Sequence, residues 1–225
     1  MNNSEAIEMA LMTLESRAKD DEPFASIFKE DLKGDCDFTS LKNHKSDGAV
    51  KRSNYIRTFI KNELSKKPCS KIATFGCGFS SYYFETGAFF SKWCNTDIKE
   101  VIDLRNKTSL VTRGGYRYYN TPFDLNIDDP ETLVVNNEYG NLLDSDIALF
   151  EGVLMYIDKD RAKYFVSLPW KCLIFDVLGN KRQKPLGPFH KWQYEFNEWG
   201  LDIEKKYNFD SPEIDSWLYV VRNDK

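Results

Sequence analysis

Two glycines and a carboxylate are the first residues of this chain whose spacing suggests chemistry. The stretch KIATFGCGF, residues 71–79, runs from a short apolar segment into Gly76, Cys77 and Gly78, and Asp97 ends the next apolar segment. Glycines have no Cβ, so the backbone can turn sharply there and lie against a ligand. A carboxylate after the following strand can accept hydrogen bonds from both hydroxyls of a ribose. These residues predict a turn that binds a nucleoside.

The third glycine of a dinucleotide-binding fingerprint is absent. It would fall at Ser81, so the G-x-G-x-x-G pattern that suits a pyrophosphate is incomplete. This favours an adenosyl ligand without pyrophosphate, and it leaves an NAD-dependent oxidoreductase as the alternative class of enzyme. Two structural interpretations also stay open. The glycines can form a plain turn, and Asp97 can cap the helix that follows it.

Short apolar runs that alternate with helical patterns must position these residues. They are KIATF, KWCNT, YRYYN, DIALF and KCLIFDVL, followed by DIEKKYNF and SWLYVVR with only DSPEID between them. Buried runs separated by helices indicate a mostly parallel α/β sheet, and the last two runs indicate an antiparallel hairpin. In an open parallel sheet, ligands bind beyond the carboxyl ends of the strands. TFGCGF stands at such an end.

The first 67 residues carry helical patterns instead. One apolar face contains Ile7, Ala10, Leu11 and Leu14, and a second contains Tyr55, Ile56, Phe59, Ile60 and Leu64. We therefore predict a single domain over residues 1–225, with a helical cap over 1–67 and an α/β core over 68–225. Within the core we expect helix N-caps at Asp129 and Asp158, and a helix end at Pro169.

Composition excludes several classes of function. The formal charge of −4 and the pI near 5.4 give no overall basic footprint, so composition does not favour nucleic acid as a partner. No apolar run approaches the roughly 20 residues of a membrane span, and acids stand where a signal peptide has basic residues, so we expect a cytoplasmic protein. The five cysteines form no C-x-x-C pair, and His44 and His190 are far apart, so we predict no metal site.

The stretch DIALFEGVLMYIDKDRAKYF, residues 146–165, is the most specific part of the chain. It places Glu151 and Gly152 directly after a strand, where burial of the charge is costly without a cationic partner. EGVLMYI resembles the E-G-L/V-L-M-Y-L segment of the leucine carboxyl methyltransferase family, which includes the tetracenomycin-type polyketide O-methyltransferases. Other stretches resemble this family in the same order: the leader TLESRAKDDEPFASIFKED, Arg52, FGCGFS, NTDIKEV and Asp124-Leu125-Asn126. The likeness covers residues 10–178.

This resemblance implies a fold, a cofactor and a set of roles. The fold would be the class I methyltransferase sheet of seven strands in the order 3-2-1-4-5-7-6, and the cofactor would be S-adenosylmethionine. Arg52 would pair with the methionine carboxylate, and Glu151 would lie near the methionine ammonium and the sulfonium. The other residues implied to bind the cofactor fall into four groups. The glycine turn would lie against the cofactor (Gly76, Cys77, Gly78), one pair would hold the ribose (Asp97, Ile98), another would bind the adenine (Asp124, Leu125), and Gly152 would lie in the loop beside it.

The activity that the resemblance implies is methyl transfer to a carboxylate or hydroxyl oxygen, with a small polyketide-like molecule as the acceptor. Ser80 and Asn126 depart from the acid and the arginine of the family, so a non-catalytic scaffold with the same fold stays an alternative. Tyr156 is predicted to line the acceptor pocket. His190, in GPFHKW, is the candidate general base for a hydroxyl acceptor. We interpret Trp192, Phe196 and Trp199 as the buried stripe of a helix.

Overall fold

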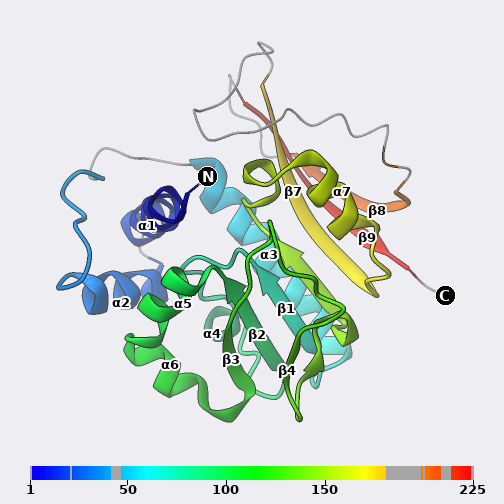
Figure 1. The fold of residues 1–225 in the computed structure, drawn as a ribbon, viewed down its shortest axis with the longest axis horizontal. Coiled ribbons are helices and arrows are strands. Elements are labelled where there is room, and N and C mark those ends of the chain that lie inside the picture. Colours follow the sequence, from blue (N-terminus) through cyan, green and yellow to red (C-terminus); the bar gives the residue numbers. More distant parts are fainter. Residues whose placement is uncertain are drawn as a thin grey trace.

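A seven-stranded sheet forms the centre of the molecule (Figure 1). A computed structural model describes residues 2–20, 22–41, 47–180, 199, 201–208 and 214–223. The strands lie in the order β3-β2-β1-β6-β7-β9-β8. Their bounds are β1 Lys71–Phe75, β2 Lys92–Asp97, β3 Tyr118–Pro122, β6 Ile147–Phe150, β7 Cys172–Asn180, β8 Ile203–Asn208 and β9 Ile214–Arg222.

The order of these strands confirms the predicted order 3-2-1-4-5-7-6. Two short strands, β4 (Val134–Asn136) and β5 (Gly140–Asn141), form a separate hairpin, so β6 is the fourth strand of the main sheet. The first five strands of that sheet pair in parallel, whereas β9 pairs antiparallel with both β7 and β8. The order of the strands reverses between β1 and β6, and the ligand site of such a sheet lies at this reversal.

The side chains of the strands alternate between two cores. Ile72 faces one core, and its neighbour Ala73 faces the other. The first core packs against the N-terminal helices α1 (Asn3–Lys19), α2 (Pro23–Leu32) and α3 (Asp47–Lys66). The second packs against α7 (Lys159–Ser167) and contains a stack of the rings of Phe75 and Phe150. Since both faces are covered, the central strands β1 and β6 read as nearly continuous apolar runs.

The N-terminal helices confirm two predictions and add an unpredicted element. The helix α1 begins where the Asn2 side chain accepts from the Glu5 amide and the Glu5 carboxylate accepts from the Asn2 amide. The helix α3 contains the second predicted apolar face. The helix α2, which begins at Pro23, was not predicted. Between the strands lie α4 (Tyr82–Glu85), α5 (Lys99–Asn106), α6 (Ser109–Gly114) and the 3₁₀ turns η1 (Gly115–Arg117), η2 (Leu142–Asp144) and η3 (Leu154–Tyr156).

One predicted helix is wrong, and another is confirmed. No helix follows Asp129, because its side chain instead accepts hydrogen bonds from the Glu131 amide at 2.9 Å and the Tyr164 hydroxyl at 2.8 Å. The bond from Glu131 closes a local Asx turn, and the bond from Tyr164 ties this turn to α7. The helix α7 begins after Asp158 and ends at Ser167, just before Pro169.

The stripe predicted around residues 192–199 falls mostly outside the described residues, within which Trp199 is buried. No described helix combines the length and the apolar character that a membrane span requires.

Candidate functional site

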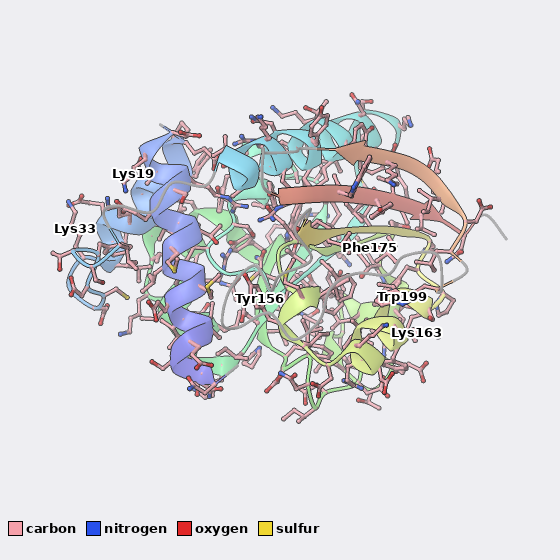
Figure 2. The ribbon with its side chains drawn as sticks, turned by 90° about the horizontal axis from the view of Figure 1, so that it is seen from above. Lys19, Lys33, Tyr156, Lys163, Phe175 and Trp199 are labelled. Carbon is pink, nitrogen blue, oxygen red and sulfur yellow. The ribbon has the colours of Figure 1, made fainter. Side chains whose placement is uncertain are left out.

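A cavity of about 230 Å³ lies where β1, β2 and β6 end. The helix α1 forms one wall, the N-terminal part of α3 contributes Arg52, and the turn η3 contributes Tyr156. Figure 2 shows α1 beside the turn that carries Tyr156. The residues that line the cavity include Ala10, Thr13, Ser16, Arg17, Arg52, Gly76, Cys77, Gly78, Phe79, Asp97, Glu151, Gly152, Val153 and Tyr156. Eight of the predicted site residues therefore share this cavity.

The glycine turn fits tightly between neighbouring segments. Gly76 and Gly78 have φ angles of +60° and +48°, a region that residues with a Cβ rarely adopt. A Cβ on Gly76 would lie 2.4 Å from Cγ2 of Val153, and a Cβ on Gly78 would lie 3.5 Å from Cβ of Ala10. The turn therefore needs glycine at both positions for its backbone angles, and at Gly76 also for its close packing against Val153.

Asp97 is held by two backbone amides at the end of β2. Its Oδ2 accepts from the Gly78 amide and its Oδ1 from the Ile98 amide, each at 2.8 Å. Burial raises the pKa of Asp97 to about 6, although these amides and Arg105 oppose the rise. Asp97 does not cap α5, because that helix begins at Lys99 with Ile98 at its N-cap. Its carboxylate instead ties the glycine turn to β2 and faces the cavity.

Glu151 stands between two guanidinium groups at the other end of the cavity. Nη2 of Arg17 lies 2.8 and 2.9 Å from its two carboxylate oxygens, and Nε of Arg52 donates to Oε1 at 2.9 Å. The hydroxyl of Tyr82 donates to Oε2 at 2.5 Å. Burial alone would raise the pKa of Glu151, but the two arginines and Tyr82 lower it to about 2. The carboxylate is therefore ionised at any physiological pH.

Asp176 extends this network into the sheet. Its Oδ2 accepts from Nη1 of Arg52 at 2.8 Å, and its Oδ1 accepts from the amide of Gly152. Gly152 has a φ angle of +64°, and a Cβ there would lie 3.1 Å from Nη2 of Arg52. The network thus contains two cations and two anions, and it fixes the loop after β6.

Three of the network's residues were not predicted as site residues. Arg17 belongs to the leader that resembles the methyltransferase family, and Tyr82 belongs to the aromatic run after the glycine turn. Asp176 is the single charge within the strand CLIFDVL and is fully buried. An isolated buried carboxylate needs a partner, so the single charge in this apolar strand is the sequence feature from which a role for Asp176 could have been predicted.

The remaining residues that were predicted to belong to the site differ in their position relative to the cavity: Asp124, Leu125 and Ile98 do not line it, whereas Tyr156 does. Asp124 and Leu125 are not among the residues that line the cavity; the Asp124 carboxylate accepts from the amide and the side chain of Asn126, and Leu125 is buried in the core. The amide of Ile98 donates to Asp97, but Ile98 is not among the residues that line the cavity. Burial raises the pKa of Tyr156 to about 12. His190 lies outside the described residues, and within those residues no cluster of His, Cys, Asp or Glu is arranged to hold a metal ion.

Comparisons with known proteins establish the fold. No family model and no curated protein matches the sequence. The magnesium protoporphyrin IX methyltransferase ChlM from Synechocystis PCC 6803, solved with bound SAH, superposes with a TM-score of 0.55 at 15% identity over 92% of this chain and 98% of that chain. The same enzyme with bound SAM gives a TM-score of 0.53 at 14% identity over 94% and 97%.

A third solved structure, an O-methyltransferase family protein from Burkholderia thailandensis, has a TM-score of 0.51 at 12% identity over 80% of this chain and 59% of that chain. Together with the strand order, these likenesses assign the chain the class I methyltransferase fold. The resemblance to the leucine carboxyl methyltransferase family stays a prediction.

Proposed function

We propose that this protein is an S-adenosylmethionine-dependent methyltransferase that transfers a methyl group to an oxygen atom of a small molecule. One observation carries the proposal: a single cavity joins the glycine turn and Asp97 to Glu151 and two arginines. A carboxylate beside a glycine turn suits a ribose, and paired acids and guanidinium groups suit the charges of an amino acid. The SAM- and SAH-bound structures of similar fold support this interpretation.

Unpartnered donors in the cavity wall fit this cofactor. Ser16 Oγ and Arg17 Nε are buried, and neither has a hydrogen-bond partner among the described residues. A buried donor without a partner costs about 1–3 kcal/mol, so an acceptor supplied by a ligand would stabilise both groups. Arg52, the predicted partner of the methionine carboxylate, already donates to Glu151 and Asp176. The carboxylate of the cofactor would therefore bind to Arg17 and Ser16 as well as beside Arg52.

When bound, the cofactor supplies a methyl group that is electrophilic because it is attached to a sulfonium. The contribution of the protein is to align the acceptor oxygen with that methyl group and to exclude water. The side chains of α1 form a wall that shields the cavity, and Glu151 places a negative charge near the sulfonium and the ammonium. Tyr156, with its raised pKa, keeps its proton at neutral pH and can donate to the acceptor but cannot act as a base.

The acceptor would be a carboxylate, which is already ionised at neutral pH, or a hydroxyl, which gains from a general base. Among the described residues of the cavity wall, both carboxylates are occupied, Glu151 by arginines and Asp97 by backbone amides. With Glu151 paired to arginines and Asp97 assigned to the ribose, this arrangement favours an acceptor oxygen that needs no deprotonation. His190 stays the candidate base for a hydroxyl acceptor.

Titration calorimetry with S-adenosylmethionine, S-adenosylhomocysteine and NADH tests the proposal. We expect saturable binding of both adenosyl ligands, weakened at least about tenfold by Asp97→Ala and by Arg52→Ala, and no binding of NADH. Asp103→Ala, which removes an exposed partner of Lys99 on α5, is the matched control and should leave affinity unchanged. Binding of NADH alone would indicate an oxidoreductase, and binding of no ligand would indicate a scaffold.

Release of S-adenosylhomocysteine in the presence of carboxylate and phenolic acceptors then tests methyl transfer itself. Turnover with one acceptor class identifies the target oxygen. Tight cofactor binding without turnover on any acceptor would contradict the enzymatic part of the proposal.

A further inference from the structure

A buried arginine outside the network of Arg17, Arg52, Glu151 and Asp176 binds the glycine turn on the side away from the cavity. Arg105, on α5, has no exposed surface and makes no ion pair with any described residue. Removing a guanidinium from water costs several kcal/mol, so a buried one requires strong compensation. Here the compensation comes mainly from backbone carbonyl groups of the turn.

All five N–H donors of Arg105 are used. Nη1 donates to the carbonyls of Gly78 at 2.7 Å and Ser80 at 3.1 Å, and Nη2 donates to the Ser80 carbonyl at 3.1 Å and to the Tyr118 hydroxyl. Nε donates to the side chain of Asn120 at 3.4 Å. The ring of Phe28, on α2, has its centroid 5.0 Å from Cζ of Arg105. The guanidinium therefore fixes the turn to α5 and to β3.

Gly78 connects this arginine to the ribose side of the cavity. Its carbonyl accepts from Arg105, while its amide donates to Oδ2 of Asp97. Resting on the proposed function, we infer that Arg105 is a positioning residue for the cofactor: by holding the Gly78–Ser80 backbone it sets the orientation of the Asp97 carboxylate that receives the ribose hydroxyls. Arg105 does not line the cavity, so it acts only through Gly78 and Asp97.

Lysine cannot replace this arrangement, because it has three donors at one nitrogen and lacks the planar fork. For Arg105→Lys we expect S-adenosylhomocysteine to bind at least about tenfold more weakly, which corresponds to one or two charge-assisted hydrogen bonds lost from the turn. Tyr118→Phe is the matched control. It removes one partner of the same guanidinium but leaves both carbonyl contacts, and it should change affinity less than about twofold.

Selectivity for the ribose separates positioning from a general loss of structure. The wild-type protein should bind S-adenosylhomocysteine at least about tenfold more tightly than an analogue that lacks both ribose hydroxyls, and Arg105→Lys should lose most of this difference. In the Asp97→Asn background, Arg105→Lys should have little further effect on affinity, since both changes break one chain of contacts. Additive effects, or ribose selectivity retained in Arg105→Lys, would overturn the inference.

A measurement on the unmodified protein covers the case in which Arg105→Lys does not fold. Nuclear magnetic resonance should show that S-adenosylhomocysteine slows hydrogen exchange of the Arg105 guanidinium and shifts the Gly78 amide resonance. A guanidinium whose exchange is unchanged by the ligand would overturn the positioning role while leaving the proposed function intact. Failure of the wild-type protein to bind S-adenosylhomocysteine would overturn both.

Discussion

The two ends of the cavity hold their carboxylates in opposite ways. Asp97 is bound by the backbone amides of its neighbour Ile98 and of Gly78, in the turn after the adjacent strand, and its pKa is raised to about 6. Glu151 is bound by side-chain guanidinium groups from α1 and α3, and its pKa is lowered to about 2. Neutral amide dipoles compensate only part of the cost of burying a charge, whereas two cations more than compensate it.

This difference separates a titratable end from a permanently charged end. The Asp97 end suits a neutral group such as a ribose, whose hydroxyls donate to the carboxylate. The Glu151 end suits a group that carries its own charges, since it can exchange one set of ion pairs for another. Five predictions test this comparison.

The largest effect should follow a change at the charged end. Glu151→Gln removes the negative charge that Arg17 and Arg52 share, and among the described residues it leaves the two buried cations with one close ion pair, that of Arg52 with Asp176. We expect a loss of about 3–5 kcal/mol in the free energy of unfolding, measured by urea denaturation. Glu30→Gln, in an exposed pair with Lys33, should cost less than about 1 kcal/mol. Equal losses in the two variants would contradict the role of burial.

The glycine turn should give the second largest effect. Gly76→Ala combines a φ of +60° with a contact of 2.4 Å to Val153, so we expect a loss of about 3 kcal/mol in stability. Gly87→Ala is the matched control, because its φ is +68° but no atom lies within 4 Å of the new Cβ. That variant should lose only about 1–2 kcal/mol. The difference between the two measures the close packing of the turn against the loop after β6.

The two ends should also differ in their response to pH. S-adenosylhomocysteine should bind about tenfold more weakly at pH 5 than at pH 7, because Asp97 takes up a proton near pH 6 and loses an acceptor for the ribose. Calorimetry from pH 5 to 8 measures this change. Asp97→Asn should bind weakly without this dependence, and a pH profile unchanged by that substitution would assign the titration to another group.

The stability of the free protein should change in the opposite direction. The pKa of Asp97 is raised above its ordinary value of 3.8, so the folded chain binds its proton more tightly than the unfolded chain. Its contribution to stability is therefore present below about pH 4 and is lost as the pH rises through about 6. Relative to wild type, Asp97→Asn should gain stability over this interval, by up to about 3 kcal/mol. Glu151 should show the opposite dependence, because its pKa is lowered from 4.5 to about 2: its contribution to stability is present above about pH 4.5 and is lost as the pH falls toward 2.

Among the three site substitutions that are compared by their loss of stability, the smallest loss should follow removal of a hydroxyl at the charged end. Tyr82→Phe removes a donor to the Glu151 carboxylate and should cost about 1.5–3 kcal/mol, as expected for a hydrogen bond to an ion. Tyr83→Phe removes a hydrogen bond of 3.1 Å to the neutral carbonyl of Gly114 and should cost about 1 kcal/mol. Denaturation of both variants checks the order, and a larger loss in Tyr83→Phe would contradict it.

The residues of the titratable end could be predicted from sequence because the information is local. The strand over residues 71–75, the glycine turn and the carboxylate that ends the next strand form a continuous pattern, and the parallel sheet then places them together. The strand order was implied by the resemblance to the methyltransferase family, and the closing hairpin, which was predicted from the apolar runs, agreed with it. Glu151 was identified for a similar reason, since it directly follows a strand.

The partners of Glu151 could not be predicted in the same way. Arg17 is 134 residues away from it in sequence, and nothing local in the leader indicates that this arginine faces β6. At Asp129 a local pattern was misleading. The sequence there predicts the start of a helix, but the Asp129 side chain instead accepts a hydrogen bond from Tyr164, which belongs to another element. Local patterns predict what a segment can form, whereas tertiary contacts decide between the possibilities.

The long separation between Arg17 and Glu151 has a consequence for the order of assembly during synthesis. The helix α1 is synthesised before β6, so the guanidinium of Arg17 has no carboxylate partner in the cavity until β6 has been made, and Asp176 follows later still. Burial of Arg17 before then would be costly, so α1 can dock stably only onto a nearly complete sheet. The cavity is therefore completed among the last steps of folding, and a chain truncated before residue 151 would present no finished binding site.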